Sequence, residues 1–192
     1  ALRWSSVYDV DDVVLDHQQE VHVDYNLELC ADFFPCALRA TGSASVLDMS
    51  ADASLACDGK RGCRHLTLKS INLVGGERMR AALPPLQVQA SVLTVESGIM
   101  SSFSSQGDGG AIRCDDQGSV VVRAMRFENT HSLQRGGAIV SRGGCSTLVS
   151  ECLFRSCSAL AHGGAIEAAG ELNISATSFQ GQPTPPRLTN PH

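Results

Sequence analysis

Gly109-Gly110-Ala111-Ile112 decides the fold of this chain, because the same four residues return as Gly136-Gly137-Ala138-Ile139 and as Gly163-Gly164-Ala165-Ile166. Both intervals are 27 residues. A fixed interval of this size is the sequence signature of a repeat architecture, in which each unit stacks on the next. Two further apolar columns keep the same spacing: Leu66, Leu93 and Val120, and Leu73, Met100, Phe127 and Phe154. Three columns in one register predict a repeat that extends from Leu66 to Ile166.

The repeating unit has the character of short β-strands. Its apolar segments are rich in branched residues and nearly alternate with polar ones, as at 66–68, 93–95, 120–122 and 172–174. Helical repeats need helix formers with apolar residues about 3.6 apart, but Gly and Ser interrupt this chain too often. The unit therefore predicts an all-β chain, a parallel β-helix (solenoid) of about five to six coils that stack ~4.8 Å apart.

Stacked coils place equivalent residues in ladders. The expected core ladder points inward and contains Ile112, Ile139 and Ile166, together with Phe127 and Phe154. Glycine pairs are expected at the corners, where both glycines supply the positive φ that a β-branched residue cannot adopt. These structural turns are Gly109 and Gly110, Gly136 and Gly137, and Gly163 and Gly164.

The same residues resemble a known family. Gly-Gly-Ala-(Ile/Leu/Val) followed by Phe-x-x-Asn is the repeat of the chlamydial polymorphic outer-membrane proteins (Pmp), and the resemblance covers roughly residues 93–182. In place of the family's Asn, this chain carries Gln106, Thr130, Cys157 and Gln182. The resemblance implies a right-handed parallel β-helix and, as a function, the surface binding of an adhesin passenger.

The chain is expected to form one domain with three parts. Residues 1–64 are predicted to be an N-terminal cap with degenerate coils, 65–180 the regular coils, and 181–192 a Pro-rich tail. Within the first part, alternation predicts a half-buried strand from Val21 to Leu29, and shorter strands at 45–49 and 53–57. The final coil is expected to expose a strand edge, because the Pro-rich tail is a poor cover.

Charge is distributed unevenly along the chain. The net charge is −5, and residues 1–60 hold 11 acidic and 3 basic residues. No basic tract is dense enough to indicate nucleic acid, and no apolar run approaches the ~20 residues of a membrane span. Trp4, Asp11 and Asp12 lie in the acidic segment, which is either a solvated face or a docking surface for a basic partner.

Eight cysteines favour an oxidising compartment: secreted, at a cell surface, or in an organelle lumen such as that of the thylakoid, rather than the cytosol. Two short loops predict disulfides, Cys57 with Cys63 and Cys30 with Cys36. Zinc is disfavoured, because the spacing is not Cys-x2-Cys and no His lies at a ligand interval. Some of the cysteines within the repeats are expected to be buried thiols that fill a column: Cys114, Cys145, Cys152 and Cys157.

The search for catalytic groups gives one cluster, Asp108, Asp115 and Asp116 with Arg113 and Arg123 nearby. We interpret it as a solvated turn, with Asp108 forming a weak surface pair with Arg135 one coil later. No histidine is expected to lie against a nucleophilic Ser or Cys. The sequence thus predicts no catalytic, cofactor-binding or metal-binding residue, and Asn173-Ile174-Ser175 is a glycosylation sequon.

Three functions are compatible with this pattern. The favoured one is a non-catalytic docking β-helix, a soluble peripheral subunit of a larger assembly, whether or not that assembly is membrane-associated. Its protein partner would cap an end of the β-helix or meet the acidic N-terminal segment. The alternatives are an adhesin-like passenger fragment and a polysaccharide-active enzyme.

Overall fold

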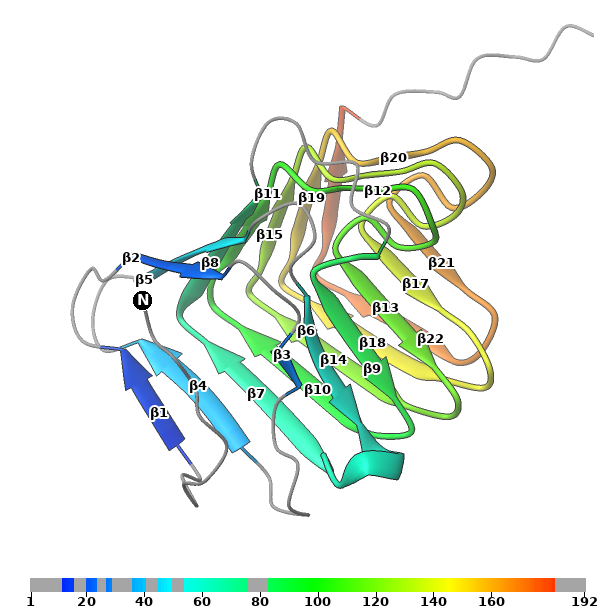
Figure 1. Cartoon of the computed structure of the whole chain (residues 1–192). Coiled ribbons are helices and arrows are strands. Elements are labelled where there is room, and N and C mark those ends of the chain that lie inside the picture. Colours follow the sequence, from blue (N-terminus) through cyan, green and yellow to red (C-terminus); the bar gives the residue numbers. More distant parts are fainter. Residues whose placement is uncertain are drawn as a thin grey trace, which may run out of the picture.

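In the computed structural model the chain forms a parallel β-helix (Figure 1). The structure describes residues 12–15, 20–23, 27–28, 36–40, 45–49, 54–75 and 83–181, and it describes side chains from residue 46 onward within these ranges. In this part of the chain, β-strands account for every regular element except one 3-10 turn, η1 (Gly59–Arg61). The fold class predicted from the 27-residue repeat is therefore confirmed.

Four parallel sheets run along the β-helix, because successive windings of the chain add strands to sheets A, B and C in turn, and three windings also add a strand to sheet D. Sheet A consists of β1 (Asp12–Leu15), β4 (Cys36–Ala40), β7 (His65–Lys69), β10 (Val92–Glu96), β14 (Ser119–Arg123), β18 (Ser146–Ser150) and β22 (Leu172–Ser175). Sheet B consists of β2 (Glu20–Val23), β5 (Ser45–Met49), β8 (Ile71–Gly75), β11 (Ile99–Ser101), β15 (Arg126–Glu128), β19 (Leu153–Arg155) and β23 (Ser178–Gln180).

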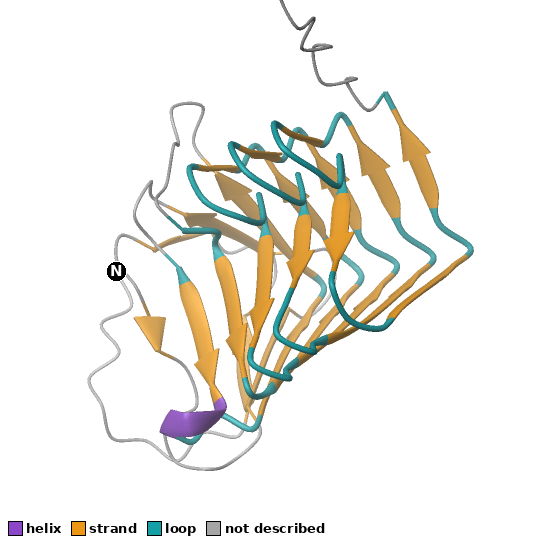
Figure 2. Cartoon of the chain, turned by 90° about the vertical axis from the view of Figure 1, so that its right-hand side faces the viewer, coloured by secondary structure: helices purple, strands orange, loops and turns teal. Residues whose placement is uncertain are grey.

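The remaining strands form sheets C and D. Sheet C consists of β3 (Leu27–Glu28), β6 (Leu55–Asp58), β9 (Leu86–Gln89), β13 (Ile112–Asp115), β17 (Ile139–Ser141) and β21 (Ile166–Ala168). Sheet D consists of β12 (Ser104–Ser105), β16 (His131–Ser132) and β20 (Ser158–Ala159). Figure 2 shows the strands of successive windings lying side by side, with the last strands at one end of the stack.

The predicted core ladder is confirmed by the strand register. Ile112 pairs with Ile139, and Ile139 with Ile166. The same column continues through Leu86, Leu55 and Leu27 in the earlier windings. Ile112 and Ile139 are fully buried, and burying such a side chain contributes about 1.5–3 kcal/mol.

An aromatic column stabilises the opposite side of the core. Phe127 lies over Phe154, with ring centroids 4.7 Å apart and planes within 2°. Phe154 in turn stacks on Phe179 at 5.0 Å. Because in-register windings repeat at about 4.8 Å, identical side chains must stack face to face. The centroid distances thus follow directly from the 27-residue repeat.

Single residues in the left-handed conformation turn the chain from sheet A into sheet B. This corner falls at one column of non-glycine residues: Ser70, Ser97, Ala124, Glu151 and Ala176, with φ between 46° and 57°. Such a conformation costs a residue with a Cβ about 1–2 kcal/mol. The repeat imposes this cost on each of these five windings.

Glu151→Gly is therefore expected to raise the free energy of unfolding by about 1 kcal/mol, because glycine removes this strain. Ser150→Gly, one residue earlier in β18, is the control and is expected to lower it by about 0.5–1 kcal/mol. Urea denaturation measures both values. A destabilising Glu151→Gly would contradict the assigned corner.

The N-terminal strands belong to the β-helix itself. β1 to β6 extend sheets A, B and C and lie within residues 1–64, the segment predicted to hold the cap and the degenerate coils. The predicted single strand from Val21 to Leu29 is wrong, because β2 lies in sheet B and β3 in sheet C. Inward residues alternate on both sides of a corner, and sequence alternation alone does not reveal the corner between them.

Candidate functional site

The two glycines of each repeated pair have different roles. Only the first has a positive φ, 77° at Gly109, 61° at Gly136 and 72° at Gly163, so the prediction is wrong for the second. A Cβ on Gly137 would meet the Gly164 carbonyl oxygen and the Ser158 backbone of the next winding. The second glycine is thus needed for the close approach of adjacent windings.

Two disulfides are present in the described residues. Cys57 pairs with Cys63 around η1, with Cα atoms 5.2 Å apart, which confirms the predicted short loop. Cys114 pairs with Cys145 at a Cα separation of 6.2 Å. Sequence analysis did not pair them, because 31 residues form no short loop. The predicted Cys30–Cys36 pair lies outside the described residues and side chains.

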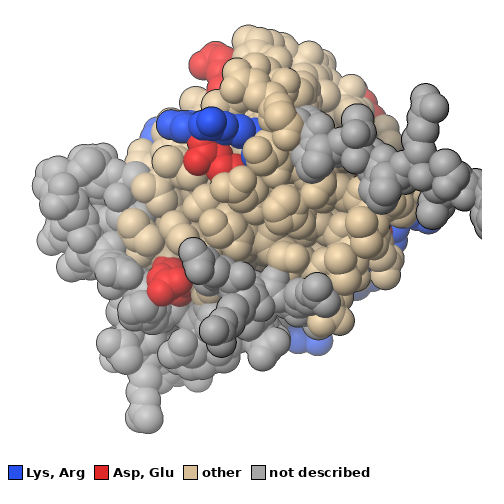
Figure 3. All heavy atoms as spheres, turned by 90° about the horizontal axis from the view of Figure 1, so that it is seen from above, with Lys and Arg blue, Asp and Glu red and all other residues tan. Residues whose placement is uncertain are grey.

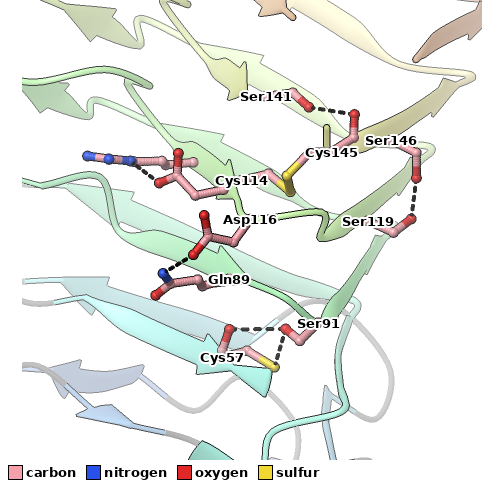
Figure 4. Close-up of a disulfide and its surroundings, with 11 residues drawn as sticks. Cys57, Gln89, Ser91, Cys114, Asp116, Ser119, Ser141, Cys145 and Ser146 are labelled. Carbon is pink, nitrogen blue, oxygen red and sulfur yellow. Dashed lines mark hydrogen bonds and ion pairs between the residues drawn. A yellow bond between two sulfur atoms is a disulfide. The ribbon is translucent and has the colours of Figure 1, made fainter. Parts of the chain in front are cut away.

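Hydroxyl groups and backbone contacts surround the sulfur atoms on the described windings (Figure 4). Ser91 donates to the carbonyl oxygen of Cys57 at 3.0 Å, and Ser141 donates to that of Cys145 at 3.4 Å. Cys152 and Cys157 are the buried thiols that the sequence predicted. Burial raises the pKa of both thiols, which keeps them protonated and unreactive at neutral pH.

The carboxylates singled out by the sequence are engaged by cations. Arg113 Nε lies 2.6 Å from Asp115 Oδ2, and Lys60 Nζ lies 2.7 Å from Asp116 Oδ2. The Lys60 hydrogen bond lowers the pKa of Asp116. A groove of about 450 Å³ lies over β6, β9 and β13 and is lined in part by Arg113 and Asp115.

The predicted surface pair between Asp108 and Arg135 is wrong, because each side chain has another partner. Its side chain is buried and lies 2.6 Å from Arg142 Nη1, whereas Arg135 pairs with Glu167 at 3.6 Å. Asp108 precedes β13 and Arg142 directly follows β17, so this contact joins the loop before one strand of sheet C to the end of the next strand. Spacing in sequence predicts neighbours within a column, but it does not reveal a loop that folds across columns.

The expectation that no histidine lies against a nucleophilic Ser or Cys is wrong, because His131 contacts Ser158. Its Nδ1 is 2.6 Å from Ser158 Oγ, because β16 and β20 pair in register. Partial burial lowers the pKa of His131. A neutral imidazole can accept the hydrogen bond from the Ser158 hydroxyl. The two residues are 27 apart, so the repeat contained the signal for this contact.

The His131 pKa has a consequence for stability. As the pH falls from about 7.5 to about 5.5, the unfolded chain binds a proton at this residue more readily than the folded chain, so stability should fall. His131→Gln is expected to reduce this loss, as measured by urea midpoints at each pH. Equal slopes for the two proteins would contradict the assigned environment.

The predicted partner-contact residues cannot form a described site. Trp4 and Asp11 lie outside the described residues, and Asp12 begins β1 with its side chain outside them. On the face shown in Figure 3, most of the coloured surface is uncharged and the main basic patch lies beside acidic atoms. Among described residues, no helix has the length and apolar character needed to span a membrane.

Exposed apolar side chains gather at the C-terminal end of the β-helix. Leu172 is 40% exposed, Ile174 41% and Phe179 45%. One winding earlier, Val149 and Phe154 occupy the columns of Ile174 and Phe179 and are fully buried. We call Leu172, Ile174 and Phe179 the C-terminal face. It consists of core positions that no described winding covers.

Comparison with protein-family models, with curated proteins and with solved structures finds no match. The resemblance of the repeat to the Pmp family stays a prediction. The function is therefore inferred from the geometry of the windings. In the described ranges, no three His, Cys, Asp or Glu side chains are arranged to hold a metal ion.

Proposed function

We propose that this protein is a non-catalytic structural subunit that docks into a larger protein assembly through the C-terminal face of its β-helix. The proposal rests on the observation that Leu172, Ile174 and Phe179 continue buried core columns yet remain exposed. Apolar groups in such an arrangement favour coverage by another polypeptide, since burial of each contributes about 1.5–3 kcal/mol.

The backbone of the same winding supports this proposal. Among the described strands, β22 and β23 are the last of sheets A and B, so each offers hydrogen-bonding groups on its outer edge. A partner strand that runs parallel to them, with apolar residues at alternate positions, would satisfy these groups and cover the apolar side chains together. This combination favours strand addition over a loose hydrophobic contact.

The compartment of this assembly is proposed to be extracytoplasmic. The two disulfides of the described residues are consistent with an oxidising environment. We propose a secreted, cell-surface or luminal location and a peripheral place in the assembly. The ion pairs of Asp108, Asp115 and Asp116 favour structural roles for these carboxylates over catalytic ones.

The test compares two arginine substitutions at equally exposed apolar residues. Ile174→Arg alters the C-terminal face, whereas Leu133→Arg alters a projecting loop whose leucine is 39% exposed. Each variant is expressed in the source organism, checked by circular dichroism, and its native mass is measured in an extract. We expect the wild type and Leu133→Arg in a large complex and Ile174→Arg as a free chain.

A photo-crosslinker at Asn173, in β22, identifies what lies on the C-terminal face. Expected is one specific adduct that Ile174→Arg abolishes. A wild-type chain that migrates as a free monomer in the extract, or an Ile174→Arg chain that remains in the complex, would overturn the proposal.

A further inference from the structure

The two ends of the described β-helix have the same strand arrangement in sheets A and B. Among the described strands, these sheets begin with β1 and β2, and they end with β22 and β23. Every pair of neighbours within these sheets is parallel. The outer edge of the last winding therefore resembles the edge that each inner winding presents to the next.

The apolar columns also run from one end to the other. Val13 of β1 shares the column that ends at Ile174. Val21 of β2 shares the column that ends at Phe179. β21 precedes β22 and β3 follows β2, so in a stack that continues these columns β3 would lie two sheet C positions beyond β21. The first winding thus offers an apolar residue at two register positions where the C-terminal end needs one.

We propose that the occupant of the C-terminal face is the first winding of a second copy of this chain, so that copies stack head to tail. This inference rests on the proposed function and names the partner. β22 of one copy would pair with β1 of the next, and β23 with β2, at the normal strand spacing of about 4.8 Å. Such a contact joins two different surfaces, so it continues into an open row of copies.

The strand register predicts which residues face the charged side chains at this contact. Asp12 meets the column position of Asn173, and His22 that of Gln180, so neither meets a charge. Opposite charges directly opposite each other strengthen strand pairing. Asn173 is therefore the residue at which an added positive charge, at the position that meets Asp12, should strengthen the stack.

Leu160 separates strand stacking from a nonspecific apolar contact. It is 61% exposed, the most exposed large apolar side chain in the described residues, and it follows β20 of sheet D. Sheet D begins only at β12, so the described strands of the first winding offer no partner for this position. Head-to-tail stacking should therefore not depend on Leu160.

Sedimentation equilibrium of the purified full chain tests the proposal with three variants. The wild type is expected to associate as concentration rises, and Ile174→Arg to weaken association by more than about tenfold. Leu160→Ser should leave it unchanged, and Asn173→Lys should strengthen it by roughly threefold. The gain from Asn173→Lys does not depend on whether the arginine variant keeps its last winding folded.

A wild type that stays monomeric up to its solubility limit would overturn head-to-tail stacking, as would a loss of association on Leu160→Ser comparable to that on Ile174→Arg. The crosslink from Asn173 then separates the two proposals. An adduct with a different protein overturns the second copy as occupant and leaves the docking function standing. A monomer without any adduct in the extract contradicts both.

Discussion

Gly137→Ala is expected to lower the free energy of unfolding by about 3 kcal/mol or more, whereas Gly164→Ala should leave it nearly unchanged. Both residues are the second glycine of the repeated pair. A Cβ on Gly137 would lie 2.5 Å from the backbone N and C of Ser158, and backbone atoms of a stacked winding cannot move aside. A Cβ on Gly164 has no atom within 4 Å.

Urea denaturation followed by circular dichroism measures both changes in the same background. Neither glycine has a positive φ, so the alanine backbone itself costs little in either protein. The difference between the two variants therefore reports only the presence or absence of an overlying winding. Equal destabilisation by both substitutions would mean that the last winding is already covered within one chain.

Removal of the Cys114–Cys145 disulfide by the double change to alanine is expected to cost about 3–4 kcal/mol. The bond closes a loop of 31 residues and joins adjacent windings through two fully buried side chains. Removal of Cys57–Cys63, whose loop spans 6 residues, is the matched control and should cost about 1.5 kcal/mol less.

The same urea denaturation, without reductant, compares the two double variants. Alanine is preferred to serine, because a buried hydroxyl without a partner would add its own cost. A smaller cost for Cys114–Cys145 than for Cys57–Cys63 would contradict the assigned cross-link between windings.

The sequence could predict the windings because sheets A and B keep a 27-residue interval from β7 to β19, and sheet C keeps it from Ile112 to Ile166. Identical spacing specifies parallel register, and register alone determines which residues form the core ladder. The first windings were less predictable. The chain takes 28 residues from Leu27 to Leu55 and 31 from there to Leu86, so no fixed interval marks their corners.

The candidate site was partly predictable. Exposure of the last strand edge follows from counting coils, and the side chains of Leu172, Ile174 and Phe179 confirm it. The second glycine of each pair, the buried Asp108 and the Cys114–Cys145 bond were not predictable in the same way. Each depends on how loops lie across neighbouring columns, which residue spacing within one column does not encode.

The most direct test of the account is amide hydrogen exchange of residues 172–180 in dilute and in concentrated or assembled protein. In the dilute monomer these amides should exchange much faster than those of β14 in the middle of sheet A. Assembly should then protect β22 and β23 while leaving β14 unchanged. If residues 172–180 are as protected as β14 in the dilute monomer, the C-terminal face is already covered and the docking proposal is contradicted.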